Sequence, residues 1–230
     1  MKISIVIPAY NEEQNLQKLL PYLKANSSGY VKEIIVVDGG SSDKTLLISK
    51  KLGTIVLKSP QKGRAAQMNY GAKRAKADIL YFLHADSYPP KNFDRLIIFS
   101  INNRTAAGCF LLRFDDDHPL LKFYSAFTAL KTPYVRFGDQ SLFVRRDMFE
   151  GIGGFREDHI VMEDQEIIHR LKQKGEFKLI KKPIITSAKK YRENGVIRLQ
   201  IIFSTIYLFY YAGATQEMLI HIYKNLIRTE

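Results

Sequence analysis

The feature that most constrains the fold of this 230-residue chain is a regular alternation of strand-like and helix-like segments in its N-terminal half. Short apolar runs rich in β-branched and aromatic residues predict strands at residues 3–7, 33–37, 54–57 and 79–83. Between them, apolar residues recur at helical spacing and predict helices at 12–24, 43–52 and 64–76. Because this alternation builds right-handed βαβ units, we expect an α/β, Rossmann-like fold whose mostly parallel sheet is flanked by helices.

The C-terminal half follows a different pattern. It predicts strands at 106–114 and 140–145, helices at 120–130 and 163–174, an extended segment at 177–187, and two final helices at about 194–212 and 215–228. No repeat, low-complexity stretch or linker divides the sequence. We therefore expect one domain over residues 1–190 and a C-terminal helical pair within 191–230, packed on that domain or on a membrane surface.

The net charge of +12 indicates an anionic partner, such as a nucleotide, a phosphorylated lipid, a membrane surface or nucleic acid, unless the charge serves solubility alone. The one cysteine, Cys109, excludes an internal disulfide and a cysteine-rich zinc site, which favours a reducing compartment. The apolar run after Lys2 is stopped at Pro8 and does not have the form of a secretion signal. The apolar segment 201–212 is shorter than the roughly 20 residues needed to cross a bilayer. We therefore expect a cytoplasmic protein.

Three of the predicted strands end in polar loops, and parallel strands bring such ends to the same edge of a sheet, where ligands bind. The first loop spans 8–13 and the second begins at Asp38, which stands where acidic residues bind a ribose hydroxyl or a base edge. The loop after the fourth strand places His84 and Asp86 on one side of an extended chain. The carboxylate of Asp86 can hold a divalent cation or, as the alternative, cap the next helix.

Two common phosphate-binding motifs, G-x-G-x-x-G and G-x-x-x-x-G-K-[ST], do not occur in the sequence. Their absence argues against a dinucleotide cofactor and excludes a P-loop. The charge of a bound phosphate must then be met by a cation at Asp86 and by basic residues, for which Arg64, Lys62 and Lys58 are placed after the third strand.

Taken together, four segments resemble the family 2 glycosyltransferases, in order and over nearly the whole chain. The stretch 5–12 resembles that family's opening strand and nucleotide loop, and 37–43 resembles its second loop. His84-Ala85-Asp86 occupies the place of the D-x-D metal motif, and Met162-Glu163-Asp164 resembles the E-D motif at the start of a helix. The resemblance implies a GT-A fold with a nucleotide-binding part at about 1–105 and an acceptor part at about 106–190.

The resemblance also implies roles for individual residues. Asp164, beside Glu163, would be the general base, and Asp86 would hold Mg²⁺ or Mn²⁺. Asp139 and Gln140 would line the pocket for the donor sugar or the acceptor. The residues implied to bind the donor nucleotide are Pro8, Ala9, Tyr10, Glu12, Asp38, Gly39, Arg64, Asn69 and Ala85. The alternative for Glu163 and Asp164 is the ordinary acidic bias of a helix N-terminus, and Tyr10 either stacks on a base or covers the sheet edge.

A finer resemblance, through 62–72, 83–86 and 138–140, is to the small bacterial radical-SAM/selenodomain-associated transferase 2 subgroup. The chain also departs from the family. His84 replaces the first acid of D-x-D, so a metal rests mainly on Asp86. The usual A-R-N becomes 67–69 (Q-M-N), and Arg64, one helical turn earlier on the same face, can supply the missing charge. The Q-x-x-R-W motif of processive synthases is absent, which argues for transfer of one sugar.

The implied function is metal-dependent, inverting transfer of a sugar from a nucleoside-diphosphate sugar to an acceptor hydroxyl, including that of a lipid or lipid phosphate. A UDP-sugar is favoured because Asp38 can accept a hydrogen bond from the imide N–H of uracil. GDP-mannose stays open, because guanine offers a similar N–H group. Retention of configuration is the alternative outcome. Two other classes stay open: a nucleotidyltransferase, and a noncatalytic protein that binds anions or nucleic acid. We expect no nucleic acid partner, because basic residues are spread along the chain without a recognition motif.

The C-terminal segment is basic and aromatic. From Lys172 onward it has eleven Lys and Arg against four Glu, and residues 201–211 are apolar almost all round. Such a helix either closes the fold, forms a dimer contact, or lies on the cytoplasmic face of an anionic membrane. Peripheral membrane contact is the interpretation that we favour here; the oligomeric state is not predicted.

Overall fold

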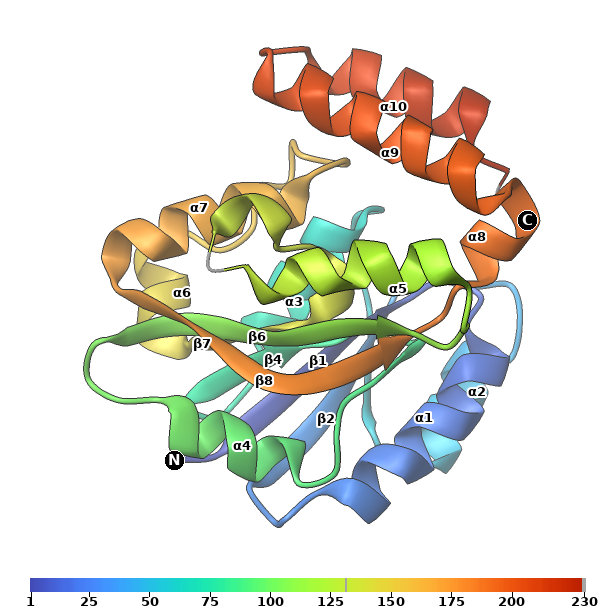
Figure 1. Cartoon of the computed structure of the whole chain (residues 1–230). Coiled ribbons are helices and arrows are strands. Elements are labelled where there is room, and N and C mark those ends of the chain that lie inside the picture. Colours follow the sequence, from blue (N-terminus) through green and yellow to red (C-terminus); the bar gives the residue numbers. More distant parts are fainter. Residues whose placement is uncertain (131, 229–230) are drawn as a thin grey trace.

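The computed structural model describes residues 1–130 and 132–228, which form one eight-stranded sheet with helices on both faces (Figure 1). The strands are β1 (Ile3–Ala9), β2 (Val31–Asp38), β3 (Ile55–Lys58), β4 (Ile79–Phe82), β5 (Ser87–Tyr88), β6 (Thr105–Phe114), β7 (Leu142–Arg145) and β8 (Glu176–Thr186). The helices are α1 (Glu13–Asn26), α2 (Thr45–Lys51), α3 (Arg64–Ala72), α4 (Phe93–Ser100), α5 (Pro119–Ala126), α6 (Arg146–Gly151), α7 (Glu163–Lys174), α8 (Lys189–Asn194), α9 (Val196–Tyr211) and α10 (Gln216–Leu226).

The strand order is β3-β2-β1-β4-β7-β6-β8-β5, and its first four strands are parallel. This half confirms the predicted βαβ alternation and brings the ends of β1, β2 and β4 to one edge of the sheet. Beyond β4 the sheet is mixed, since β7 is antiparallel to both β4 and β6 whereas β8 is parallel to β6. The predicted α/β fold with a mostly parallel sheet and a C-terminal helical pair is confirmed.

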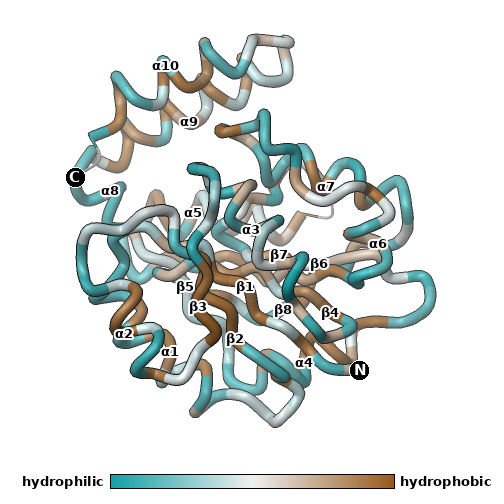
Figure 2. Tube along the Cα trace, turned by 180° about the vertical axis from the view of Figure 1, so that it is seen from behind, coloured by the Kyte–Doolittle hydropathy of each residue, from teal (hydrophilic) through white to brown (hydrophobic). Residues whose placement is uncertain are grey.

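The core explains why β1 is apolar at nearly every position. Ile5 and Ile7 point to one face, where they pack under α1 and α4, whereas Val6 points to the other, under α3 and α7. A strand buried on both faces needs no polar alternation. Figure 2 shows the resulting band of hydrophobic backbone (brown) through β1 to β4 in the interior. This rigid centre holds the polar loops at its edge.

Several elements differ from the prediction. Helix α4 was not predicted, because its apolar residues 96–99 run consecutively and hide the helical pair Phe93 and Ile97, both buried. Helix α6 and strand β5 are too short to show a period. The predicted helix 120–130 ends at Ala126 and continues as the 3₁₀ turn Phe127–Ala129. The strand predicted from residue 140 begins at Leu142, since Gly138–Gln140 forms a 3₁₀ turn and Ser141 has a φ of 58°.

The C-terminal helices α9 and α10 pack as a pair above α5, and α8 connects them to β8 (Figure 1). A third hydrophobic cluster joins Leu199, Ile202 and Ile206 of α9 to Leu121 of α5 and Tyr191 of α8. Within the part of the chain that the structure describes, no helix has both the length and the apolar character needed to span a bilayer.

Candidate active site

The loops after β1 and β2 are joined by direct hydrogen bonds at the sheet edge. The Gly39 amide donates to the Ala9 carbonyl (2.8 Å), and the Asn11 amide donates to the Ser41 hydroxyl (2.9 Å). The buried Asp38 carboxylate accepts from the amides of Gly40 and Ser41, each at 3.1 Å, which shapes the second loop. The structure thus brings together residues 8–10 and 38–39, which are among those predicted to bind a nucleotide, and Tyr10 is exposed there.

Gln67 is a residue of this region that sequence reasoning did not single out. Its amide, on α3, donates to the carbonyls of Ala9 and Val37, both at 2.8 Å, so one side chain fixes the ends of β1 and β2. A β-carbon on Gly39 would lie 3.0 Å from the Gln67 amide nitrogen, so a side chain at this position would press against the Gln67 amide. The sequence did mark Gln67, since it is the first residue of the Q-M-N that replaces the usual A-R-N. That departure was interpreted only as the loss of an arginine.

Carboxylates gather below these loops. Burial raises the pKa of Glu12, and the nearby Asp86 raises it further, although Asn15 donates to its carboxylate at 2.6 Å. Burial also raises the pKa of Asp86, with a contribution from Asp139. Asp86 thus lies near both Glu12 and Asp139, and a neighbouring carboxylate makes ionisation of Glu12 and of Asp86 less favourable. Together with the adjoining pocket lined by His84, Glu163 and Asp164, these carboxylates form the cleft.

His84 pairs with Asp139 in the cleft. Its Nδ1 lies 3.2 Å from Asp139 Oδ1. Partial burial would raise the pKa of Asp139, but the hydrogen bond and charge of His84, with Lys190 and Arg64 nearby, outweigh it and lower the pKa to about 2. His84 therefore has a carboxylate partner on the loop before β7. This contact could not be inferred from the position of His84 at the first acid of the D-x-D motif.

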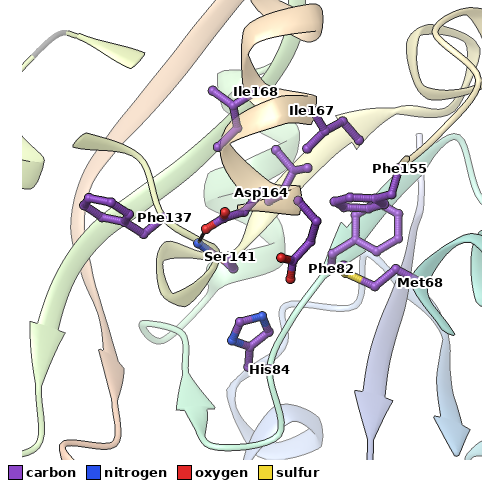
Figure 3. A pocket seen from close by; sticks show the side chains of 12 residues that line it. Met68, Phe82, His84, Phe137, Ser141, Phe155, Asp164, Ile167 and Ile168 are labelled. Carbon is purple, nitrogen blue, oxygen red and sulfur yellow. Dashed lines mark hydrogen bonds between the residues drawn. The ribbon is translucent and has the colours of Figure 1, made fainter. Parts of the chain in front are cut away.

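Asp164 lies in the first turn of α7, in a pocket beside His84 (Figure 3). Its Oδ2 accepts from the Gly138 amide, and its Oδ1 accepts from the Gln165 amide at 2.8 Å. Burial and the charge of Glu163 raise the pKa of Asp164 to about 6, against the lowering effect of those two amides. The carboxylate is thus fixed in direction and poised to take up a proton near neutral pH.

Glu163 and Gly138 frame this carboxylate. Glu163 is buried and forms an ion pair with Arg64 (3.2 Å), so α3 and α7 are joined across the pocket. Burial would lower the pKa of Arg64, but Glu163, Asp139 and other nearby groups raise it. A β-carbon at Gly138 would lie 3.1 Å from the His84 ring and 3.3 Å from Asp164 Oδ2, so the 138 backbone runs between the two side chains. In Figure 3, Met68, Phe82 and Phe155 form an apolar wall on the other side.

Two predicted site residues have their polar atoms bonded inside the fold. Asn69 donates to the Phe155 carbonyl (2.8 Å) and accepts from the Phe155 amide (2.9 Å), and so holds the segment before α7. The buried Gln140 donates to the Phe110 carbonyl (2.9 Å) and accepts from the Phe137 amide (3.1 Å). Asn69, predicted to bind the nucleotide, thus binds the backbone of Phe155, and Gln140, predicted to line the sugar or acceptor pocket, binds the backbone of Phe110 and Phe137. Both side chains hold backbone segments in position.

Replacing Asn69 with alanine is therefore expected to destabilise the fold and to leave nucleotide affinity nearly unchanged. The buried amide and carbonyl of Phe155 would lose their partners, at a cost of about 1–3 kcal/mol in the free energy of unfolding. Urea denaturation measures that loss, and calorimetric titration of a nucleoside diphosphate measures affinity. A variant of normal stability that no longer binds the nucleotide would restore the predicted binding role.

A divalent cation fits the donor set of the cleft only in part. In residues 1–130 and 132–228, no group of three or more His, Cys, Asp or Glu side chains is arranged to hold a metal. Asp86 nevertheless offers carboxylate oxygens, and the hydrogen bond that one of them accepts from the Ser87 hydroxyl is long at 3.4 Å. Oxygen ligands suit Mg²⁺ and Mn²⁺, which commonly take the rest of their shell from substrate phosphates and water. Asp86 therefore fits a cation that arrives with such a substrate.

Known proteins resemble the chain in sequence. Residues 4–160 match the model of glycosyl transferase family 2. The chain is 32% identical over 103 residues to a dolichol-phosphate mannosyltransferase of Pyrococcus furiosus, covering 42% of this chain and 29% of that protein. It is 27% identical over 174 residues to glycosyltransferase AglE of Haloferax volcanii, covering 69% and 57%. The chain thus spans less than two thirds of the length of these relatives, and the finer subgroup resemblance stays a prediction.

Solved structures show the same architecture. The mannosyltransferase PcManGT from Pyrobaculum calidifontis, in complex with GDP-Man and Mn²⁺, superposes with a TM-score of 0.71 at 18% identity, over 92% of this chain and 64% of that one. S. aureus TarS in complex with UDP-GlcNAc gives 0.67 at 20% identity, over 81% and 58%. These likenesses establish the GT-A fold. Since the family model covers more than half of the sequence, the chain belongs to glycosyl transferase family 2.

Proposed function

We propose that this chain is a glycosyltransferase that moves a single sugar from a nucleoside-diphosphate sugar to an acceptor hydroxyl, with inversion at the anomeric carbon. The observation that carries the proposal is the placement of Asp164, a carboxylate with a pKa raised to about 6, in the same cleft as Asp86 and the two joined loops. A base and an anion-binding edge in one cleft suit transfer from a phosphorylated leaving group.

In this proposal the donor nucleotide lies on residues 8–10 and 38–39. A UDP-sugar is favoured and GDP-mannose is the alternative, and support for both comes from neighbours of the same fold, since TarS was solved with UDP-GlcNAc and PcManGT with GDP-Man. Asp86 would hold Mg²⁺ or Mn²⁺ together with the diphosphate. When bound, that cation would neutralise charge that develops on the leaving diphosphate.

Asp164 is the proposed general base. Its carboxylate would accept the proton of the acceptor hydroxyl as the oxygen attacks the anomeric carbon, while the Gly138 and Gln165 amides keep the carboxylate in place. Glu163 acts on Asp164 through its charge and stays paired with Arg64. Direct attack by the acceptor from the face opposite the diphosphate needs no covalent enzyme intermediate and inverts the configuration.

Release of the nucleotide separates the proposed function from its alternatives. We expect the chain, given UDP-sugars or GDP-mannose with Mn²⁺ and a polyprenyl phosphate, to release the nucleoside diphosphate. A nucleotidyltransferase would instead release pyrophosphate from a nucleoside triphosphate and a sugar phosphate. Binding of random RNA or DNA that weakens with salt, without any nucleotide release or nucleotide binding, would support the noncatalytic alternative and contradict a transferase.

The acceptor that we propose is a lipid or lipid phosphate reached at an anionic membrane. Relatives supply one argument: they include the mannosyltransferase named for dolichol phosphate and an undecaprenyl-phosphate 4-deoxy-4-formamido-L-arabinose transferase of Edwardsiella ictaluri, 33% identical over 41% of this chain. The fold supplies another, since Ile197, Ile201 and Leu208 of α9 are exposed along its outer side, in a segment rich in lysine and arginine. The cytoplasmic location stays a prediction.

Vesicle binding tests this surface. We expect the chain to sediment with vesicles that contain phosphatidylglycerol, and Ile201→Asp to weaken binding about tenfold or more, because an apolar contact becomes a charge repelled by the headgroups. Leu47→Asp on α2, where Leu47 is equally exposed, is the matched control and should bind normally. No sedimentation of the wild type, together with a dimeric mass that Ile201→Asp abolishes, would assign the surface to a dimer contact.

A further inference from the structure

The C-terminal helices bring Lys190 to the cleft, although sequence analysis gave this residue no role there. Strand β5 pairs with β8 so that Ser87 lies opposite Thr186, and their hydroxyl oxygens are 2.9 Å apart. The residue before Ser87 is Asp86, and α8 begins three residues after Thr186. The chain that leaves β8 therefore passes directly beside the loop that holds Asp86.

The ammonium group of Lys190 is held in position by α10. It donates to the hydroxyl of Tyr223 (2.9 Å) and lies 5.7 Å from the centre of the same ring. Its charge lowers the pKa of both Asp86 and Asp139, and the charge of Arg64 also lowers the pKa of Asp139. Lys190 of α8 and Arg64 of α3 thus both lie near the Asp139 carboxylate, and Tyr223 of α10 holds Lys190 there.

The cleft has many carboxylates, so an anionic substrate needs a positively charged group such as Lys190 there. The cleft contains the carboxylates of Glu12, Asp86, Asp139, Glu163 and Asp164, which would repel a phosphate. Arg64 is already paired with Glu163, and no ion pair links Lys190 to a carboxylate among residues 1–130 and 132–228. An ammonium group has three N–H donors, of which the Tyr223 contact uses one. Among the residues that the structure describes, two donors therefore remain for an anion.

We propose that Lys190, positioned by Tyr223, binds a phosphate group of a substrate in the cleft, next to Arg64. The phosphate comes either from the diphosphate of the donor or from a phosphorylated acceptor. The inference rests on the proposed function, and it makes the C-terminal helices a part of the active site rather than an appendage. Tyr223 is a positioning residue, since it acts through the lysine.

Calorimetry on the full chain tests this assignment. The proteins compared are the wild type, Lys190→Gln, Lys190→Arg and Tyr223→Phe. One titration series uses UDP and GDP with Mn²⁺. The other uses farnesyl phosphate, with farnesol as its uncharged counterpart. Losing one charged hydrogen bond to phosphate is expected to weaken binding about tenfold or more in Lys190→Gln. Lys190→Arg should keep most of the affinity, and Tyr223→Phe should give a smaller loss. Lys224→Gln, an exposed lysine next to Tyr223, is the matched charge control.

The arms of the experiment distinguish the two sources. A loss confined to UDP or GDP assigns the phosphate to the donor, and a loss confined to farnesyl phosphate assigns it to the acceptor. Equal affinities of Lys190→Gln and wild type for all of these phosphates overturn the inference and leave the proposed function intact. So does an equal loss in Lys224→Gln, which would show a general effect of charge. If the wild type binds neither nucleotide nor farnesyl phosphate, the inference falls together with the proposed function. Thermal unfolding midpoints check that each variant is folded.

Discussion

Replacing Asp164 with asparagine is expected to lower the rate of transfer by about 10²–10⁴-fold, the usual contribution of a positioned base. The substitution keeps the size of the side chain and its acceptor oxygen for the Gly138 or Gln165 amide, but it removes the group that takes the proton. Nucleotide affinity should change little, because the carboxylate of Asp164 accepts from the amides of Gly138 and Gln165 rather than from residues 8–10 or 38–39. The rate is measured as release of nucleoside diphosphate from the donor that the wild type uses, and affinity by calorimetry.

The pH dependence gives this prediction a second readout. Since the pKa of Asp164 is raised to about 6, the wild-type rate should rise through pH 6 as the carboxylate loses its proton. Asp164→Asn should show no such rise. Glu163→Gln removes the charge that helps to raise this pKa, so the rise should move to lower pH, by an amount that the rate profile reports. A full rate in Asp164→Asn, or an unchanged profile in Glu163→Gln, would contradict the assignment of the base.

The raised pKa of Asp164 also predicts how the free energy of unfolding depends on pH. The transfer rate should rise as Asp164 loses its proton, whereas the stability of the fold should fall. Asp164 has an ordinary pKa of 3.8 when unfolded and a raised one when folded, so folding favours its protonated form. Its contribution to stability is therefore complete below about pH 3.8 and is lost as the pH rises through 6. Asp164→Asn should accordingly increase the free energy of unfolding at pH 8 relative to its effect at pH 4. Urea denaturation at the two pH values makes the comparison, and a variant destabilised more at pH 8 than at pH 4 would contradict it.

The part of the site that could be predicted from sequence is the part that local pattern determines. The strands before Asp38 and Asp86 are continuous apolar runs, and the position of a carboxylate just after such a run follows from the βαβ alternation. Glu163 and Asp164 were placed correctly at a helix start, because α7 has a clear period and ends at a glycine. These features depend on residues close together in the chain.

What could not be predicted depends on contacts between distant residues. His84 meets Asp139 across 55 positions, and Asn69 meets Phe155 across 86, so their side-chain partners cannot be inferred from spacing. Lys190 reaches the cleft only because β5, a strand of two residues, pairs with the end of β8. The basic C-terminal segment could be interpreted from sequence as a membrane contact or a closing helix, but not as a wall of the cleft.

Replacing Asp86 with asparagine is expected to abolish the enhancement of nucleotide affinity by Mn²⁺ and to lower transfer about 100-fold or more, since a neutral amide is a poor ligand for a hard cation. Calorimetric titration of UDP and GDP with and without Mn²⁺ measures the enhancement in both proteins. Asp117→Asn removes an acid that is exposed and paired with Lys122, and it should behave as the wild type.

The cleft explains why this loss should be separable from any loss of folding. Burial and the nearby Asp139 raise the pKa of Asp86, so without a cation its ionised form opposes folding above its unfolded pKa, and the neutral asparagine should be at least as stable near neutral pH. A stable variant that no longer responds to metal is the signature of a lost ligand, whereas a general collapse of the site would reduce stability and metal-free binding together. Should Asp86→Asn keep the full Mn²⁺ response, the cation must rest on Glu12 or Asp139 instead, and the D-x-D resemblance of this loop would have no role in metal binding.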